Sequence, residues 1–288
     1  MTSTHEQWDI VSGVGITALA VAGGRAVESQ REDRLINDPY AADLVAAAGS
    51  TMFTEMENSP AELLEAMSGY LGVRTRFFDE YFLRAAAGGV QQAVILASGL
   101  DTRAFRLAWP EGLRVFEIDQ PKVLQFKDDT LNRIDAEPGS DRRVVPVDLR
   151  DDWASALEAA GFDATKPTAW LAEGLLPYLP PEAEAQLLAT VDRLSAPGSR
   201  LSIEHMAGPR DRFATDEMQA IGRQWGIDLL GLFSTDDRPD PEDVLKRAGW
   251  QVRREPTNEI AAGYGRELPG FTRRFAEVGC MLTAFRES

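Results

Sequence analysis

Residues 93–103, Ala-Val-Ile-Leu-Ala-Ser-Gly-Leu-Asp-Thr-Arg, and residues 113–119, Leu-Arg-Val-Phe-Glu-Ile-Asp, decide how this chain folds. The apolar run at 93–96 is typical of a buried parallel strand, and Gly99 follows where the chain must turn tightly beyond the carboxyl end of that strand. The second segment indicates a neighbouring strand that ends on Asp119. Together they predict a ligand crevice in which Asp119 could hold the hydroxyls of a ribose.

After residue 88 the pattern of strands and helices alternates, which is typical of a parallel sheet covered on both faces. The expected strands are residues 93–96, 113–118, 143–147, 168–172, 200–204, 250–254 and 280–285. Four successive strands are followed by or end on an acid, namely Asp119, Asp148, Glu173 and Glu204. Parallel strands carry their carboxyl ends on one edge of a sheet, so these acids are expected to gather near the crevice.

The 288 residues are expected to form a single domain. Its core is expected at 89–288, with a cap before the core and a lid inserted within it. Residues 1–88 are predicted to be a helical N-terminal cap, with one helix after the capping box at 59–62 and a further helix that carries aromatic side chains on one side. Residues 206–238 are apolar but interrupt the strand–helix alternation. They are therefore predicted to fold over the carboxyl edge of the sheet as a lid.

Composition excludes several classes of partner. The net charge of -16 argues against nucleic acid, because binding to phosphates needs clustered Lys and Arg. One cysteine, Cys280, excludes an internal disulfide, and two histidines make a zinc site improbable, so no metal is expected. The apolar patch at 14–22 is too short to cross a membrane and lacks the features of a signal peptide. We expect a cytoplasmic protein without a membrane partner.

The loop after the first strand discriminates between nucleotide ligands. An NAD(P)-dependent oxidoreductase is disfavoured, since Ala97, Gly99 and Thr102 occupy the three positions of its Gly-x-Gly-x-x-Gly motif. The chain also contains neither a Gly-Lys pair for a phosphate-binding loop nor a Gly-x-Ser-x-Gly elbow. S-adenosyl-L-methionine has a ribose and an adenine but no pyrophosphate. One glycine therefore suffices for its close approach.

Several segments then make the similarity specific. Residues 94–107, 116–121, 148–149 and 172–179 resemble the leucine carboxyl methyltransferase-like family of class I methyltransferases, whose bacterial branch holds many S-adenosylmethionine-dependent O-methyltransferases. The resemblance extends over about residues 13–285. It implies a Rossmann-like α/β fold with a seven-stranded, mostly parallel sheet. It also implies S-adenosyl-L-methionine as the cofactor and S-adenosyl-L-homocysteine as the product.

The family pattern also implies roles for individual residues. Gly99 would contact the methionine side of the cofactor, Asp119 the ribose, and Asp148 with Leu149 the adenine. Glu173 would line the floor near the methionine moiety. The remaining members of the predicted cofactor site are Arg74, Ala97, Asp101, Arg103, Gln120 and Gly174.

For three of these residues the role can be stated more closely or has an alternative. The resemblance matches Arg74 to an arginine that pairs with the cofactor carboxylate, a contact that suits a guanidinium. Asp101 could instead cap the following helix, and Arg103 could brace the sheet edge. Arg25 is a candidate for a second cationic contact.

Methyl transfer is an in-line displacement, so the protein must chiefly orient the acceptor oxygen and exclude water. A carboxylate acceptor needs no general base, whereas a phenol or an alcohol does. The sequence offers only His205 and Glu173 as candidate bases and identifies no catalytic residue. We therefore expect O-methylation of a carboxylate on a small molecule or peptide. A phenol or hydroxyl O-methyltransferase of natural-product tailoring and a non-catalytic S-adenosylmethionine-binding protein stay as alternatives, and the oligomeric state is left open.

Overall fold

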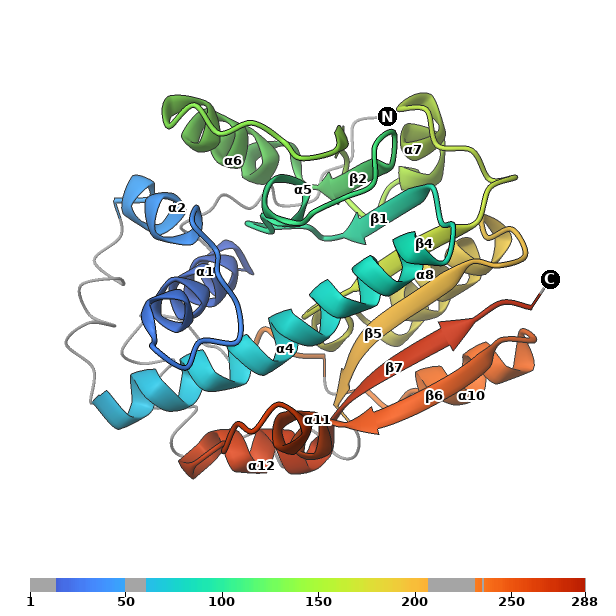
Figure 1. Cartoon of the computed structure of the whole chain (residues 1–288). Coiled ribbons are helices and arrows are strands. Elements are labelled where there is room, and N and C mark those ends of the chain that lie inside the picture. Colours follow the sequence, from blue (N-terminus) through green and yellow to red (C-terminus); the bar gives the residue numbers. More distant parts are fainter. Residues whose placement is uncertain (1–13, 50–60, 207–230, 235, 288) are drawn as a thin grey trace.

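The computed structural model describes residues 14–49, 61–206, 231–234 and 236–287. Its strands form a seven-stranded sheet in the order β3-β2-β1-β4-β5-β7-β6 (Figure 1). They are β1 (Gln92–Leu96), β2 (Arg114–Asp119), β3 (Asp141–Pro146), β4 (Thr168–Ala172), β5 (Arg200–Met206), β6 (Gln251–Pro256) and β7 (Gly279–Phe285). β7 runs antiparallel to β5 and β6, and the other pairs are parallel. The predicted α/β fold with a mostly parallel sheet is confirmed.

The two edge strands differ from their predicted bounds. β3 starts at Asp141 rather than at residue 143, and β6 ends at Pro256 rather than at residue 254. Both strands lie at an edge of the sheet, where most of their side chains are only partly buried. Their bounds follow the register with the inner neighbour, in which Asp141 pairs with Arg114 and Pro256 with Cys280. Hydrophobicity alone therefore marks them less sharply than the central strands.

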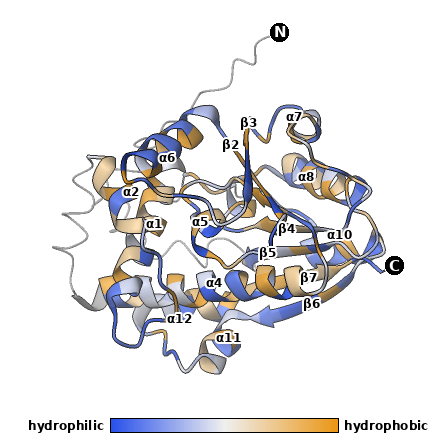
Figure 2. Cartoon of the chain, turned by 45° about the horizontal axis from the view of Figure 1, so that its top comes forward, coloured by the Kyte–Doolittle hydropathy of each residue, from blue (hydrophilic) through white to orange (hydrophobic). Residues whose placement is uncertain are grey.

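Helices cover both faces of the sheet. One face carries α1 (Val14–Gln30), α2 (Ala41–Ala47), α4 (Ala61–Ala87), α6 (Pro121–Arg133), α11 (Thr257–Gly263) and α12 (Gly270–Val278), and the other carries α7 (Trp153–Ala159), α8 (Pro181–Arg193) and α10 (Pro241–Arg247). Along β1, Ala93 and Ile95 belong to the first core, whereas Val94 and Leu96 belong to the second. This alternation on two buried faces explains the continuous apolar run. Figure 2 shows polar and apolar residues on the same helices, such as α8.

The prediction of two successive helices before residue 88 is wrong, because α4 is one helix of 27 residues. In Figure 1 it lies over the sheet with its axis roughly aligned with the strands, and it buries Phe78, Phe82 and Ala85. Gly72 does not interrupt α4. A Cβ at Gly72 would lie 2.7 Å from the carboxyl carbon of Glu28, so the glycine lets α1 and α4 pack closely. Residues 59 and 60 of the capping box lie outside the described residues.

Two helices near the C-terminus, α11 and α12, were not predicted. They are short and are separated by a segment with glycine and proline, so their hydrophobic period is difficult to recognise. Of the expected lid, residues 207–230 and 235 lie outside the described residues. The described end of that segment packs on the short 3-10 turn η1 (Leu176–Tyr178), where the ring centroids of Phe233 and Tyr178 are 5.2 Å apart. In the part of the chain that is described, no helix is long and apolar enough to cross a bilayer.

Candidate active site

A cavity of about 560 Å³ lies at the carboxyl ends of β1, β2 and β4, and α1 contributes to its lining. β1 lies between β2 and β4, so the cavity occupies the point where the strand order reverses, the usual ligand position in open α/β sheets. Its volume lies within the range of small-molecule sites. All eleven residues of the predicted cofactor site line this one cavity: Arg74, Ala97, Gly99, Asp101, Arg103, Asp119, Gln120, Asp148, Leu149, Glu173 and Gly174.

The carboxylate of Asp119 holds the turn after β1. Its Oδ2 accepts a hydrogen bond of 2.6 Å from the amide of Gly99, and its Oδ1 accepts one of 2.6 Å from the amide of Gln120. Gly99 has a φ of +48°, in the left-handed region that glycine adopts without strain. Burial raises the pKa of Asp119, although both amide donors oppose that shift. A glycine bend and a carboxylate from the next strand thus meet at the cavity wall.

Ala97 is in the same turn and also has a left-handed backbone, with a φ of +51°. This conformation costs an L-residue about 1–2 kcal/mol, a cost that glycine avoids. Glycine also makes the unfolded chain more flexible, and this offsets about 0.4–1 kcal/mol of the stabilisation. We therefore expect Ala97→Gly to raise the free energy of unfolding by up to about 1 kcal/mol, measured by urea denaturation. Ala156→Gly in α7 is the control and should lower it by about 0.5–1 kcal/mol. A less stable Ala97→Gly protein would contradict the prediction.

The opposite side of the cavity combines a fixed carboxylate with an apolar wall. Asp148 accepts a hydrogen bond of 3.1 Å from Nε2 of Gln120. Nε and Nη2 of Arg150 also donate to it, at 2.9 Å and 2.6 Å. Val147 and Leu149 line the same region. This wall can hold a flat heterocycle through apolar contact while one carboxylate accepts its exocyclic donor.

Arg74 on α4 lies at the end of the cavity near β4 and β5. Its Nε donates to Glu173 at 2.8 Å, and its Nη1 donates to Glu204 at 3.1 Å. The hydroxyl of Tyr70 donates to the other oxygen of Glu204 at 2.8 Å. Nη2 of Arg74 has no hydrogen-bond partner among the residues that the structure describes, and it lies 3.9 Å from where a Cβ of Gly174 would be. That nitrogen can donate to a ligand carboxylate.

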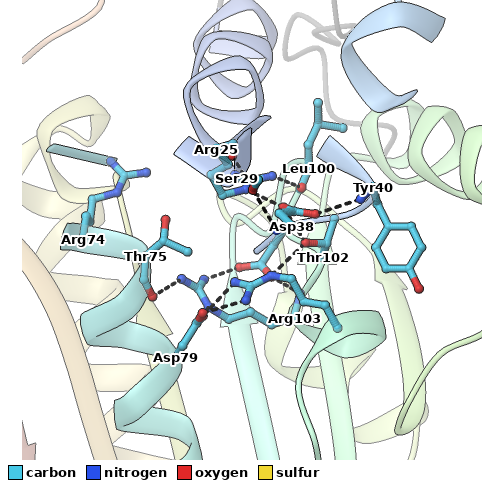
Figure 3. Close-up of polar contacts among 12 residues, drawn as sticks. Arg25, Ser29, Asp38, Tyr40, Arg74, Thr75, Asp79, Leu100, Thr102 and Arg103 are labelled. Carbon is cyan, nitrogen blue, oxygen red and sulfur yellow. Dashed lines mark hydrogen bonds and ion pairs between the residues drawn. The ribbon is translucent and has the colours of Figure 1, made fainter. Parts of the chain in front are cut away.

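Arg103 is almost fully buried and joins three carboxylates, of which Figure 3 labels Asp79. It donates to Asp79 at 2.7 Å and to Glu173 at 2.6 Å, and it also pairs with Asp101. Burial alone would raise the pKa of Glu173, but Arg103 and Arg74 outweigh burial and hold that pKa below its usual value. Arg103 does the same for the pKa of Asp101, whose carboxylate also accepts the amide of Arg103 at 2.7 Å. Arg103 therefore braces the site and also lines the cavity.

A second buried ion pair fastens α1 over the turn after β1 (Figure 3). Nε of Arg25 donates to Asp38 at 2.8 Å, and Nη2 of Arg25 donates to the carbonyl of Leu100 at 2.7 Å. The hydroxyl of Thr102 donates to Asp38 at 2.8 Å. Arg25 lines the cavity, but it donates to Asp38 and to the carbonyl of Leu100, because α1 must be anchored where it covers the sheet edge.

Sequence reasoning missed most of the cavity wall that is remote from the β1 turn. The additional lining residues include Gly15, Thr17, Ala18, Val21, Ser98, Tyr178 and Leu179. No local signal identified α1 as part of the wall, but Tyr178 belongs to the segment 172–179 that carried the family resemblance. Burial raises the pKa of Tyr178, whose hydroxyl also interacts with Thr17, so the phenol stays protonated as a hydrogen-bond donor. Tyr178 therefore adds a polar group to a largely apolar region.

His205, one of the two candidate bases, does not line the cavity. Its Nε2 lies 3.7 Å from the carboxylate of Asp240, which precedes α10. Among the described lining residues there is no histidine. Glu173 does line the cavity, but the two arginines described above stabilise its ionised form.

Comparison with known proteins agrees with this architecture. Residues 18–192, more than half of the chain, match the family model of leucine carboxyl methyltransferase. A protein of Saccharopolyspora erythraea, named "Putative S-adenosyl-L-methionine-dependent methyltransferase", is 59% identical over 286 residues, which cover 99% of this chain and 100% of that protein. A Rhodococcus jostii protein of the same description is 49% identical over 283 residues, covering 96% of each chain.

Solved structures share the fold at low sequence identity. A "putative methyltransferase" from Thermobifida fusca has a TM-score of 0.55 at 18% identity, covering 94% of each chain. A DUF574 family protein from Streptomyces avermitilis has a TM-score of 0.56 at 16% identity, covering 93% of this chain and 97% of that one. The family match and the close relatives establish the family, and the solved structures agree with the fold. The chain belongs to the leucine carboxyl methyltransferase family and is a methyltransferase.

Proposed function

We propose that this methyltransferase methylates an oxygen of a carboxylate on a small molecule or peptide. The methyl donor is S-adenosyl-L-methionine, the cofactor on which the named relatives depend. When bound, it supplies an electrophilic methyl group on a sulfonium. The residues of the cavity fit this cofactor, since one end offers a free guanidinium nitrogen and the other a carboxylate beside an apolar wall.

In this proposal, different residues of the cavity contact different parts of the cofactor. Nη2 of Arg74 donates to the carboxylate of the methionine moiety, as a charge-assisted hydrogen bond. Asp119 accepts the ribose hydroxyls with the lone pairs that Gly99 and Gln120 leave free. Asp148 and Leu149 flank the adenine. The turn after β1 and part of the cavity wall are formed by Ala97, Gly99, Asp101 and Gly174. Glu173 holds Arg74 in place and is itself held by Arg103.

The observation that carries the choice of a carboxylate is the state of the acids that line the cavity. Asp101 and Glu173 are ion-paired with arginines, and both have lowered pKa values after the opposing effect of burial. Burial raises the pKa of Asp119, but both of its oxygens accept hydrogen bonds from backbone amides, and in this proposal it binds the ribose. Asp148 is held by guanidinium donors. A general base works best when its pKa is near the working pH, and Glu173 is shifted away from that value. A carboxylate acceptor is already anionic and needs no such base.

What remains for the protein is orientation and exclusion of water. The cavity is walled by α1 and by the described end of the segment before α10, and Tyr178 adds a hydroxyl to its lining. Holding an acceptor oxygen in line with the methyl group can supply about 7–11 kcal/mol of the barrier. A dry site further favours the neutralisation of an anionic acceptor by a cationic donor.

The acceptor class can be tested directly. The protein is incubated with methyl-labelled cofactor and matched pairs of aromatic carboxylic acids and phenols, and each product is treated with mild alkali. Methyl esters release labelled methanol, whereas methyl ethers keep the label. We expect alkali-labile label with the acids only, and its loss in Arg74→Gln but not in Arg143→Gln, an exposed arginine on β3. Label found only in ethers would reject the carboxylate, and cofactor binding without any product would indicate a non-catalytic member.

The pH profile gives an independent test. We expect kcat to stay nearly constant between about pH 6 and pH 8, because carboxyl groups with a usual pKa of about 4 are fully ionised there. Since arginines lower the pKa of Glu173 further, it adds no titration in this range. The measurement is label transfer at saturating substrates across this interval. A rate that rises about tenfold per pH unit would instead indicate deprotonation of a hydroxyl acceptor.

A further inference from the structure

A second cavity, of about 540 Å³, lies beside the C-terminal end of α4 and extends from the amino end of β5 along β6 and β7. Its lining includes three arginines, Arg84, Arg200 and Arg253, one acid, Glu255, and the rings of Tyr81 and Phe285, and none of its lining residues lines the first cavity. Arg200 is the first residue of β5 and pairs with Phe285 at the end of the antiparallel β7. Figure 1 shows the C-terminal end of α4 and the arrowhead of β7 on the same side of the molecule.

Arg200 is the unusual residue of this groove. Its Nε is buried without a hydrogen-bond partner, and its guanidinium makes no ion pair with any residue in the described ranges. The guanidinium carbon lies 5.6 Å from the ring centroid of Phe285, in the range of a cation–π contact. A buried charged donor without an acceptor is destabilising. The terminal nitrogens of the same guanidinium also have no hydrogen-bond partner among the described residues, and Arg200 lines the groove, so these nitrogens can donate to an anion bound there.

Packing explains how Arg200 stays in place. A Cβ at Gly88 would lie only 2.7 Å from Nη2 of Arg200, so the guanidinium occupies space that the glycine leaves open. The carbonyls of Arg84 and Ala85, in the last turn of α4, lie near the same point. The negative end of the helix dipole tolerates a cation there but provides no hydrogen bond to Nε.

Two further arginines make the groove cationic in a chain with a net charge of -16. Nη1 of Arg84 contacts Glu80 at 3.1 Å, and Nη2 of Arg253 contacts Glu255 at 2.9 Å. Both arginine side chains are more than half exposed, at 59% and 76%. Such exposed pairs contribute little to stability, so a ligand oxyanion can replace their acceptors at little cost.

We propose that this groove is a second ligand site, which binds a small molecule that carries an oxyanion, phosphate or carboxylate, on an aromatic body. Arg200 donates to the oxyanion with Arg84 and Arg253 around it, and the aromatic body packs beside Phe285 and Tyr81. The guanidinium fork matches both kinds of oxyanion. The cavity is far larger than a bare ion and lies within the range of metabolite sites.

Calorimetric titration of the full-length protein with inorganic phosphate, phenyl phosphate and benzoate tests the proposal. We expect saturable binding of a ring-bearing probe that is tighter than that of inorganic phosphate. Tighter binding of phenyl phosphate would indicate that the natural ligand carries a phosphate, and tighter binding of benzoate that it carries a carboxylate. Arg200→Gln should weaken binding about tenfold or more, as expected for the loss of a charged hydrogen bond. Affinity for S-adenosyl-L-methionine should not change, because the two cavities share no lining residue.

Two further variants serve as a control and as a second test of the proposed site. Arg114→Gln is the matched control, since Arg114 also begins a strand but has Asp141 as an acidic partner, and it should bind the probes like the wild type. Gly88→Ala displaces the guanidinium of Arg200 without removing it, and it should weaken probe binding even if Arg200→Gln folds poorly. Equal binding by the wild type and Gly88→Ala, or the absence of saturable binding by any probe, would overturn the proposal.

Discussion

Asp119→Ala is expected to bind S-adenosyl-L-methionine about a hundredfold or more weakly than the wild type. A carboxylate that accepts two ribose hydroxyls makes two charge-assisted hydrogen bonds, each contributing about 1.5–3 kcal/mol, so their loss corresponds to at least two orders of magnitude. The substitution also frees the amides of Gly99 and Gln120, which the carboxylate holds at 2.6 Å. The turn after β1 then loses its support as well. Isothermal calorimetry measures the affinity.

The control for this experiment is Asp141→Ala on β3. Asp141 is also an acid on a parallel strand, but it is partly exposed and forms ion pairs with Arg114 and Arg143. It should bind the cofactor like the wild type. Circular dichroism and thermal unfolding must show that the Asp119→Ala protein is folded. If a folded Asp119→Ala protein binds as tightly as the control, Asp119 does not hold the ribose.

Lys127→Met is expected to lower the free energy of unfolding by up to about 3–5 kcal/mol, the cost of removing one partner of a buried ion pair. Lys127 on α6 and Glu117 on β2 are both fully buried, and their charged atoms are 2.8 Å apart. Nζ of Lys127 also donates to the carbonyl of Asp101 at 2.8 Å. One oxygen of Glu117 has no hydrogen-bond partner among the described residues, so without Lys127 the carboxylate depends on Arg142, which contacts its other oxygen at 2.7 Å. Urea denaturation measures the loss.

The double variant Glu117→Gln/Lys127→Met separates charge burial from lost packing. It removes both charges, so we expect it to recover much of the stability that Lys127→Met alone loses. Arg142 then loses one acceptor but keeps Asp128 at 2.7 Å. Lys246→Met is the surface control, since its pair with Glu242 is exposed, and it should change stability by less than about 1 kcal/mol. Equal stability of Lys127→Met and the wild type would contradict the argument.

The central strands and the turn between β1 and α5 (Arg103–Arg106) were predictable because their signals are local. A buried strand with helices on both faces needs a continuous apolar run, and a left-handed turn favours a glycine such as Gly99. The edge strands and α11 and α12 were predicted less well or not at all. Their side chains are partly exposed, so the pairing register and local packing, rather than hydrophobicity, set their limits.

By itself the sequence determined which acids stand at the strand ends, because the carboxyl ends of parallel strands always meet at one edge. Asp119, Asp148 and Glu173 accordingly line one cavity. Only the tertiary structure decided which charges meet there. Arg74 contacts Glu173 across 99 residues of chain, and Arg103 contacts it across 70. The first pair depends on how α4 packs on the sheet and the second on the pairing of β1 with β4, and no local pattern of side chains encodes a contact between segments so far apart.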